Sequence, residues 1–421
     1  MMIGKKTVVV IGGGASGFFC AVNCARLNPE LKVTLLERSS KLLAKVRVSG
    51  GGRCNVTHSC FDNRELVKNY PRGQKELLSA FNRFSVAETI KWFEDRGVKL
   101  KTEDDGRMFP ISDSSESVIS CLMEEARKYG VDIRLNCDVI QISHSIAEAD
   151  RAGGNGTESV FKLSLVHGEP VSCDVLVIAT GGRPKESGYD WLLSSGHGIE
   201  KPVPSLFTFN IPDKVLIGLM GVSVQHARVR IKGHKLESEG PLLITHWGMS
   251  GPAVLKLSAW GARLLNDLNY HFTIQVSWLP NFTEEKLRID FEGKRRLNGA
   301  KLLSNILPEG IPRNLWEYLI SKAGIADGLR SADLTNKQMN MLINVLLNDE
   351  YVVSGKTTFK EEFVTCGGVK LGDIDFKTMQ SKKIPGLYFT GEVLDIDGVT
   401  GGFNFQNAWT TGWLAAMDIG R

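Results

Sequence analysis

The chain has 421 residues, 42% of them apolar and 23% charged, with a net charge of +4. This is the composition of a globular protein with two or three domains. The small net charge permits an anionic ligand but argues against a nucleic-acid partner. No uninterrupted apolar run approaches the ~18 residues that span a membrane. None of the eight cysteines forms a C-x-x-C pair or has metal-like spacing to a histidine, so we expect no metal site. Because no apolar run is long enough to span a membrane, we expect a cytoplasmic protein.

The first predicted element is a dinucleotide-binding unit. Residues 7–11 have the β-branched composition of a strand buried on both faces, a helix is expected over 18–27, and a second strand over 32–36 precedes Glu37. Between the first strand and the helix the sequence fits G-x-G-x-x-G, with glycines at Gly12, Gly14 and Gly17. These glycines permit a sharp turn, close approach of a pyrophosphate and tight helix–sheet packing. Strand, loop, helix, strand and acid arrive in the order of a dinucleotide site, which leaves NAD(P) and FAD both open.

Residues 41–59 are too glycine-rich and too polar for an ordinary helix or strand. Gly50-Gly51-Gly52 can bring backbone close to a ligand, and Lys45, Arg47 and Arg53 supply positive charge. We interpret this segment as a contact to an anion or to a ring. A basic surface loop is the alternative.

Helices and strands alternate between residues 85 and 180. Ser85 begins a helix through a capping box with Glu88, a hairpin is expected over 98–110, and a further helix over 116–128. Strands follow over 131–136, 139–142, 160–166 and 171–179, with a Gly/Asn hairpin loop over 151–157. The last strand ends in Thr180-Gly181-Gly182. A β-meander followed by an A-T-G turn is typical of large FAD enzymes, so this order favours FAD.

The composition changes near residues 200 and 355. Alternating stretches over 205–279 predict an antiparallel sheet or small barrel, with a helix beginning at Ser250-Gly251-Pro252, and residues 283–350 have a helical period. We therefore predict an α/β protein with a discontinuous FAD-binding domain over 1–200 and 355–421, a β-barrel-like insert over 201–280 and a helical part over 281–354.

A second glycine-rich helix start lies in the tail. A strand over 386–390 leads to Gly391-Glu392, and Gly401-Gly402-Phe403-Asn404 begins a final helix that reaches about residue 417. In a flavin enzyme this start would place backbone N–H groups and a helix dipole at flavin N1/C2=O. An ordinary helix cap is the alternative.

Five motifs identify a family. They are SGGGRCNVT (49–57), GRMFPIS (106–112), THWGMSGPAVLKLS (245–258), VTCGGV (364–369) and GLYFTGEVLDIDGVTGGFNFQNAWTTG (386–412). With them the chain resembles the BaiN/RdsA (aminoacetone oxidase-like) family of bacterial NAD(P)/FAD-dependent flavoproteins. The resemblance implies a glutathione-reductase-like FAD-binding Rossmann domain built from both termini, interrupted by a β-barrel plus helical insert.

The resemblance also implies a set of cofactor contacts. The ADP part of FAD would contact Gly12, Gly14, Ala15, Ser16, Gly17 and Glu37, and adenine would meet the backbone of Val139. Arg53, Cys54 and Asn55 would lie near the flavin end, Gly391 and Glu392 near the ribityl or pyrophosphate, and Gly401, Gly402, Phe403 and Asn404 near the ring. Arg38, Lys45, Gly52, Thr180 and Gly181 complete the expected set. The chain departs from the family pattern in a shortened loop after Gly182 and in His58, which replaces an asparagine.

The predicted activity is that of an FAD-dependent oxidoreductase that transfers hydride through flavin N5 to or from a small organic substrate. No second G-x-G-x-x-G follows a strand, so NAD(P)H, the candidate reductant, would bind transiently or over the insert. Two candidates for proton transfer are Cys54, beside Arg53 in a setting that lowers a thiol pKa, and His246. Their alternatives are a small packing residue and a structural histidine.

Two other function classes stay open. A tRNA-modifying flavoprotein would need Arg228, Arg230, Lys232 and the run Lys294-Arg295-Arg296 to form one continuous basic patch. A flavin-binding sensor would bind the cofactor without turnover. The sequence leaves the substrate and the oligomeric state open.

Overall fold

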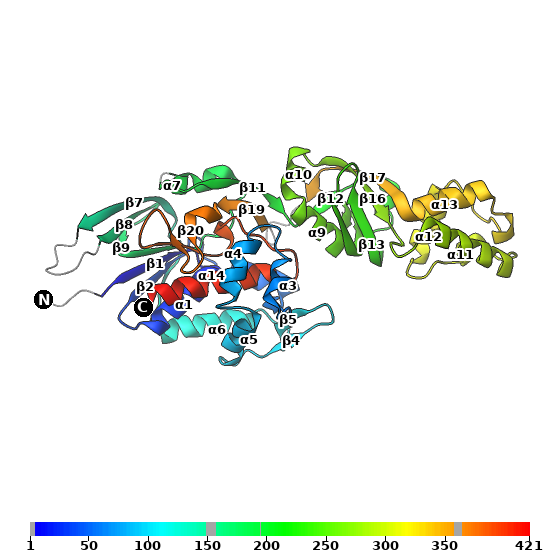
Figure 1. Cartoon of the computed structure of the whole chain (residues 1–421). Helices are drawn as coiled ribbons and strands as arrows, with labels where there is room; N and C mark the ends of the chain where they lie inside the picture. The colour runs from blue at the N-terminus through cyan, green and yellow to red at the C-terminus, as the bar shows by residue number, and fades with distance from the viewer. Residues whose placement is uncertain (1–4, 149–156, 194, 358–363) are drawn as a thin grey trace. The chain divides into compact units, whose positions relative to one another are not determined.

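The computed structural model describes residues 5–148, 157–193, 195–357 and 364–421 (Figure 1). The chain divides into two compact units, unit 1 (Met1–Pro204 with Lys360–Arg421) and unit 2 (Ser205–Phe359). The Gly/Asn hairpin loop predicted over 151–157 lies outside the described residues except for Thr157. Among the described helices, none combines the length and the apolar character that crossing a membrane requires.

The core of unit 1 is a seven-stranded sheet. Its order is β20-β21-β22-β10-β1-β2-β6, and the pairs from β22 to β6 are parallel. The strands are β1 (Thr7–Ile11), β2 (Lys32–Leu36), β6 (Asp132–Arg134), β10 (Val175–Ile178), β20 (Ile374–Asp375), β21 (Gln380–Ser381) and β22 (Leu387–Phe389). Because β1, β2, β10 and β22 are parallel neighbours, the loops after them meet at one edge of the sheet.

Helices cover this sheet, and α1 packs against α14 in Figure 1. Gly412 permits this contact because a Cβ there would lie 2.7 Å from Ser16 O. The helices of unit 1 are α1 (Ala15–Leu27), α2 (Ala44–Gly52), α3 (Asn63–Val67), α4 (Gln74–Phe81), α5 (Val86–Glu94), α6 (Glu116–Lys128), α7 (Asp190–Leu193) and α14 (Phe403–Ile419), with 3₁₀ turns at Glu186–Tyr189, Leu371–Asp373 and Gly391–Val393. The predicted capping box of Ser85 and Glu88 is confirmed at α5.

Three smaller sheets complete the described part of unit 1. One contains β3 (Thr57–His58), β5 (Arg107–Pro110) and β4 (Leu100–Thr102), the second is the meander β7 (Val139–Glu148), β8 (Thr157–Leu165) and β9 (Val171–Cys173), and the third pairs β11 (Ile199–Ser205) with β19 (Val364–Val369). The hairpin predicted over 98–110 is confirmed by β4 and β5.

Two sequence predictions in unit 1 need correction. The single strand predicted over 171–179 is two strands, β9 and β10, because Asp174 between them is bound to β1: its Oδ2 accepts from Thr7 N and Thr7 Oγ1, both at 2.7 Å. Residues 41–59 contain a helical segment, α2, although Ser49, Gly50 and Gly51 inside it have non-helical dihedral angles.

Unit 2 is built on a second seven-stranded sheet, antiparallel throughout the described pairs. Its order is β17-β16-β13-β14-β15-β12-β18. The strands are β12 (Thr208–Asn210), β13 (Ser223–Ile231), β14 (Glu237–Thr245), β15 (Gly248–Ser250), β16 (His271–Ser277), β17 (Asp349–Ser354) and β18 (Lys356–Thr357), and the helices are α8 (Lys214–Ile217), α9 (Pro252–Trp260), α10 (Ala262–Asp267), α11 (Glu284–Leu297), α12 (Arg313–Lys322) and α13 (Asn336–Asn348), with 3₁₀ turns at Leu303–Asn305 and Ser331–Asp333. The helix start predicted at Ser250-Gly251-Pro252 is confirmed by α9, with proline at its first position.

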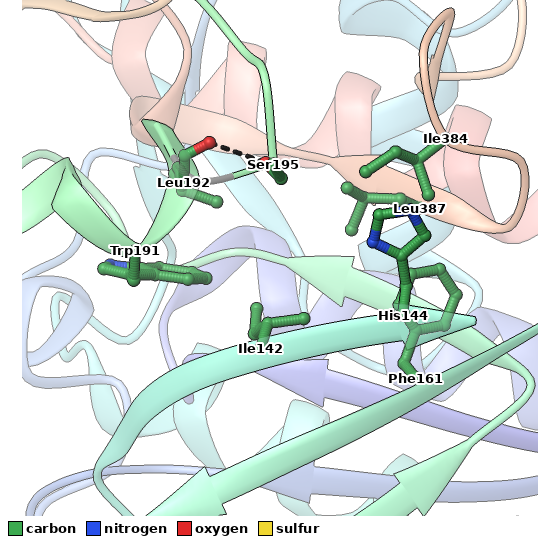
Figure 2. Close-up of a pocket in the computed structure, with 8 residues that line it drawn as sticks. All are labelled: Ile142, His144, Phe161, Trp191, Leu192, Ser195, Ile384 and Leu387. Carbon is green, nitrogen blue, oxygen red and sulfur yellow. Dashed lines mark hydrogen bonds between the residues drawn. The ribbon is translucent and has the colours of Figure 1, made fainter.

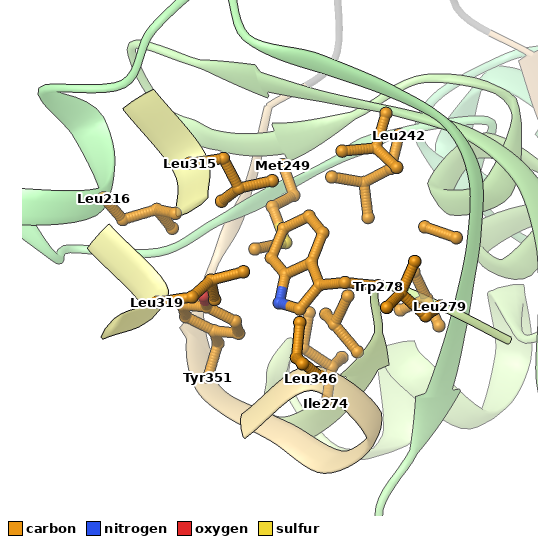
Figure 3. Close-up of a cluster of buried hydrophobic side chains, with 14 of the residues drawn as sticks. Leu216, Leu242, Met249, Ile274, Trp278, Leu279, Leu315, Leu319, Leu346 and Tyr351 are labelled. Atoms are coloured by element: carbon orange, nitrogen blue, oxygen red, sulfur yellow. The ribbon is translucent and has the colours of Figure 1, made fainter. Parts of the chain in front are cut away.

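The sheet and helices of unit 2 share one apolar core (Figure 3). Trp278 lies at its centre, fully buried, with Met249, Leu315 and Leu346 around it in Figure 3. Its indole Nε1 donates to Asp349 Oδ2 at 3.0 Å, so the largest side chain of this core also has its polar atom satisfied.

Candidate cofactor site

The predicted glycine loop follows β1, and its three glycines have different surroundings. Gly12 has a φ of +116°, and a Cβ at Gly17 would collide with the carbonyl oxygen of Gly12. Both positions therefore require glycine for the fold itself. Gly14, the N-cap of α1, has ordinary extended dihedral angles, and nothing lies within 4 Å of the place of its Cβ. The space beside Gly14, at the positive end of α1, is open to a ligand.

Glu37 lies directly after β2 and faces this loop. Its Oε2 accepts from Gly13 N at 2.8 Å, and its Oε1 accepts from Ser39 N at 2.9 Å and Ser39 Oγ at 2.8 Å. Cys137 N donates to Glu37 O at 2.9 Å, which brings Val139 at the start of β7 to the same corner. The structure therefore brings the residues predicted for the adenosine end together, with Arg38 exposed next to them.

A second group lies after β10 and β22. Lys45 Nζ lies 2.6 Å from Glu392 Oε2, and Glu392 Oε1 accepts from Thr365 N at 3.0 Å. Thr180 and Gly181 follow β10, and the place of a Gly181 Cβ lies 3.9 Å from Glu392 Oε2. Two predicted residues, Lys45 and Glu392, are thus bound to each other at the shared edge of the sheet.

Buried polar atoms without partners lie in this second group. Among the described residues, the hydroxyl groups of Thr365 and Thr390 are buried and have no hydrogen-bond partner. A Cβ at Gly182 would collide with Thr365 Oγ1, and one at Gly391 would collide with Ser16 Oγ. Glycines therefore keep the backbone close to the hydroxyls of Thr365 and Ser16, and the donors and acceptors of this group suit a polyhydroxylated, anionic chain such as the ribityl diphosphate of FAD.

The loop SGGGRCN is held by its own contacts. Arg53 lies 2.5 Å from Glu103 Oε1 and 3.6 Å from Asp113 Oδ1, and its guanidinium lies 4.0 Å from the centre of the Phe109 ring. Gly52 O accepts from Ser115 N at 2.8 Å. These contacts attach the loop to the β4–β5 hairpin and to the start of α6. The charge of Arg53, which the sequence suggested for the flavin end, is paired with acids of this chain.

Cys54 departs from its predicted chemistry. Its side chain is fully buried, and burial raises the pKa of the thiol to about 12, the opposite direction to the one predicted from the neighbouring arginine. The cause is that Arg53 directs its charge to Glu103 while the sulfur lies in the core. Cys54 is therefore a protonated, buried thiol. Its backbone lies in the left-handed region, with a φ of 62°.

Two asparagines fix the start of α14. The Asn55 side-chain amide accepts from Gly402 N at 2.9 Å and donates to Thr57 O at 2.9 Å. Asn404 closes the preceding loop: its Oδ1 accepts from Gly398 N at 2.8 Å and its Nδ2 donates to Gly398 O at 2.9 Å. Together with Gly401 (φ +129°) and the buried Phe403, these two asparagines hold the backbone at the start of α14 in one conformation.

Sequence reasoning missed several residues around this helix start. Arg72 forms a bidentate ion pair with the buried Asp397, Tyr70 OH donates to Phe403 O at 2.7 Å, and the His58 ring stacks on Phe403 with centroids 4.8 Å apart. Only His58 left a signal, as a departure from the family motif. The other contacts join segments far apart in the chain, and composition does not report them.

His246 lies in unit 2 and Cys54 in unit 1, so the two proton-transfer candidates belong to different units. His246 is exposed in the turn between β14 and β15, with its ring 4.7 Å from that of Trp247. Three of the basic residues predicted for a nucleic-acid patch have acidic partners: Arg228 pairs with Glu239, Lys232 with Glu350 and Lys294 with Asp290. Arg230 and Arg295 instead donate to the neutral acceptors Gln275 Oε1 and Leu334 O.

A small cavity in unit 1 is lined by residues that do not belong to the groups described above (Figure 2). Its volume is about 30 Å³, and it lies between the meander, α7 and the loop before β22, with Ile142, Phe161 and Leu387 among its lining residues. Figure 2 shows Ser195 bound to Leu192 at its rim. It has room for about one water molecule, so it is a packing void and has no place in cofactor binding.

These features define a Rossmann-type FAD-binding fold: a parallel sheet with a glycine loop after β1, an acid after β2, an A-T-G-G turn after β10 and a glycine-led helix after β22. The model of the family described as HI0933-like protein Rossmann domain matches residues 6–418, and the chain belongs to this family. The family and the fold class predicted from the sequence motifs are both confirmed.

Two relatives cover nearly the whole chain. A protein of Haemophilus influenzae named ribosomal RNA dihydrouridine synthase is 29% identical over 98% of both chains. One of Clostridium scindens named 3-dehydro-bile acid delta(4,6)-reductase is 27% identical over 96% of this chain and 97% of its own. Among solved structures, 3-ketosteroid delta1-dehydrogenase from Sterolibacterium denitrificans superposes with a TM-score of 0.53 at 12% identity, covering 99% of both chains, which shows a shared fold. The class of this protein is FAD-dependent oxidoreductase.

Proposed function

We propose that the protein is an FAD-dependent reductase that adds a hydride from the flavin and a proton from water across a carbon–carbon double bond conjugated with a carbonyl group, with NAD(P)H as the candidate reductant. The two relatives named above support this reaction. Dihydrouridine differs from uridine by two hydrogens across a double bond conjugated with a ring carbonyl. The delta-4 double bond of a 3-oxo steroid is conjugated with its ketone in the same way. Reduction of a double bond conjugated with a carbonyl group is therefore the reaction that the names of both relatives imply.

The observation that carries the cofactor proposal is a pair of buried threonine hydroxyls, which have no hydrogen-bond partner in the described part of the chain, together with the open start of α1. Gly14 would leave room for the diphosphate, which the N–H groups at the start of α1 would bind. Glu37 would accept from the ribose hydroxyls, and Thr365 and Thr390 would bind the ribityl chain. Bound FAD would supply hydride at N5.

The start of α14 would act on the flavin ring through its dipole. The positive end of this helix favours negative charge, which develops at N1/C2=O when the ring is reduced. Asn55, Asn404 and Arg72 would keep this helix start in place through the contacts described above. Their role is to position backbone, and none of them needs to touch the substrate.

The test begins with the purified protein. We expect a yellow protein whose flavin is bleached by NADPH or NADH under anaerobic conditions in a stopped-flow mixer. Reduced protein mixed with 4-androstene-3,17-dione should be reoxidised, whereas the saturated androstane-3,17-dione should leave it reduced. A protein that binds no FAD would contradict the cofactor. Bleaching without reoxidation by the enone or by uridine in RNA would contradict the reductase. No bleaching with any reductant would favour a sensor.

A second candidate substrate of the same reaction is uridine in RNA, favoured by the name of the Haemophilus relative. Unit 2 has 18 Lys and Arg against 14 Asp and Glu, so it holds the whole net charge of +4. Since several of these cations are paired with acids, the charge gives only weak support to RNA binding. Dihydrouridine measured by mass spectrometry in ribosomal RNA, after incubation with NADPH and the protein, decides between the two substrates.

A further inference from the structure

The loop after β10 holds one arginine in a defined place. Arg183 N donates to the hydroxyl oxygen of the fully buried Tyr189 at 3.0 Å. Gly188 packs against the stem of this arginine, since a Cβ at Gly188 would lie 2.8 Å from Arg183 Cβ and 3.0 Å from its Cγ. Gly188 has no unusual φ, so close approach is the reason for glycine there. The loop is built around the Arg183 side chain.

The guanidinium of Arg183 lies among charged groups of the adenosine corner. The pKa of Arg183 is lowered, first by burial and then by the positive charge of Arg38, while Asp138 and Glu37 act in the opposite direction. Arg183 lies in the loop after β10 and Arg38 lies just after β2, so the strand order β10-β1-β2 places these residues on opposite sides of the end of β1. Two arginines and two acids thus interact electrostatically at the adenosine corner.

The hydrogen bonding of this arginine is incomplete. Arg183 Nε is buried and has no hydrogen-bond partner among the described residues. A half-buried cation that repels a second cation costs free energy unless a ligand or an anion offsets it. Guanidinium groups bind phosphate oxygens with paired N–H groups and stack on planar rings, and an adenosine diphosphate group offers both an anion and a ring.

We propose that Arg183, together with Arg38, binds the adenosine diphosphate group of the cofactor at the edge of the sheet where the loops after β10, β1 and β2 meet. This inference rests on the proposed function, because FAD is the source of that group. NAD(P)H carries the same group and is the other possible source, so the experiment separates the two. Arg183 acts on binding of the non-reacting half of FAD, and the flavin ring does not touch it.

The test compares dissociation constants of apoprotein for FAD, FMN and ADP by fluorescence titration, in wild type, Arg183→Ala and Lys185→Ala. Lys185 is an exposed residue of the same loop and is the matched control. We expect Arg183→Ala to weaken FAD and ADP at least tenfold and to leave FMN, which lacks the adenosine, within twofold. Lys185→Ala should leave all three unchanged. Gly188→Ala, which displaces the stem without removing the charge, should weaken FAD in the same direction.

Arg183→Lys keeps the charge and the fold while removing the planar guanidinium, so it serves if the alanine variant does not fold. FAD affinity within twofold of wild type in the folded Arg183 variants would overturn the inference. A raised KM for NADPH with unchanged FAD affinity would also overturn it, by assigning the corner to the reductant. If wild type itself binds no FAD, the proposed function fails, which is a different result.

Discussion

The carboxylate of Glu37 accepts a hydrogen bond from Gly13 N at 2.8 Å, across the opening of the glycine loop. Glu37→Ala removes this acceptor and the one proposed for the ribose. We expect the Kd for FAD to rise about 10- to 100-fold, because hydrogen bonds to charged groups contribute roughly 1.5–3 kcal/mol each. Fluorescence titration of apoprotein measures it. Glu30→Ala, on an exposed loop, is the control and should leave the Kd unchanged. An equal Kd for FAD in both variants would show that Glu37 does not bind the cofactor.

Gly14 and Gly17 allow a direct separation of ligand binding from folding. Gly17→Ala would collide with backbone and should lower the free energy of unfolding of the apoprotein by more than about 2 kcal/mol. Gly14→Ala meets nothing in the protein, so apoprotein stability should change by less than about 1 kcal/mol. FAD binding should nevertheless weaken strongly in Gly14→Ala. Urea unfolding and FAD titration measure the two effects, and an unimpaired Gly14→Ala would contradict the diphosphate position.

Local signals predicted the elements that depend on neighbours in sequence. Ser85 with Glu88, Gly251 with Pro252, and the strand over 7–11 each contain their own cause: a cap, a fixed φ or a buried apolar run. The order of these elements then predicted the parallel sheet and the cofactor edge. These features could be inferred because the interactions behind them span only a few residues.

Contacts between distant segments could not be inferred in this way. The sequence around Arg53 offers a free cation, yet Glu103 in a separate hairpin takes its charge. Asn55 bonds to Gly402 and Arg183 is fixed by Gly188 and Tyr189, and in each case several partners were chemically possible. Only the packed structure shows which partner each residue binds. It also shows that the pKa of the Cys54 thiol is raised, because Arg53 binds Glu103 and the sulfur is buried.

The buried thiol of Cys54 should be unreactive in the folded protein. Because burial raises its pKa to about 12, almost no thiolate exists at pH 8. Iodoacetamide should therefore label the partly exposed Cys60 and Cys137 well before Cys54, as peptide mass spectrometry would show. Cys54→Ala should keep flavin reduction by the same reductant within about threefold. Early labelling of Cys54, or a loss of reduction by orders of magnitude, would restore it as a catalytic candidate.

Stability should depend on pH through His197. Burial lowers the pKa of His197 to about 4, while the negative charge of Asp373 opposes this shift and the positive charge of Lys383 adds to it. Its Nε2 accepts from Ser381 Oγ at 2.8 Å, since that hydroxyl already accepts from Lys383 N and Ile384 N. The unfolded chain thus binds more protons between about pH 4 and the ordinary histidine pKa of about 6.5.

The stabilisation from neutral His197 is therefore complete above about pH 6.5 and is lost as the pH falls towards 4. We expect the free energy of unfolding of wild type to fall by roughly 2 kcal/mol more than that of His197→Gln over this range. Urea unfolding at pH 7 and pH 4.5 measures the difference. His271→Gln, at an exposed histidine, should follow wild type. Parallel curves for wild type and His197→Gln would exclude this role.

Asp349 is buried in unit 2, where it forms hydrogen bonds and an ion pair that stabilise the fold. Its carboxylate accepts from Trp278 Nε1 and from Tyr351 OH, and it lies 2.5 Å from Lys322 Nζ. Asp349→Ala leaves a cation and two donors without their acceptor, which should lower the free energy of unfolding by roughly 3–5 kcal/mol. Glu350→Ala next to it removes an exposed ion pair with Lys232 and an exposed hydrogen bond from Gln275, and should cost less than about 1 kcal/mol. Denaturation followed by tryptophan fluorescence compares them, and equal losses would contradict the buried network.

The pairing of β10 with β22 has a consequence for biosynthesis. The whole of unit 2 is translated between these two neighbouring strands. At 5 to 20 residues per second, β10 emerges from the ribosome about 10 to 40 s before the strand that covers its free edge. Unit 2 has its complete sequence before β22 is translated and can fold then, while the cofactor edge still lacks Thr390, Gly391 and the start of α14. The cofactor edge of the sheet is therefore complete only after β22 and the start of α14 have been translated.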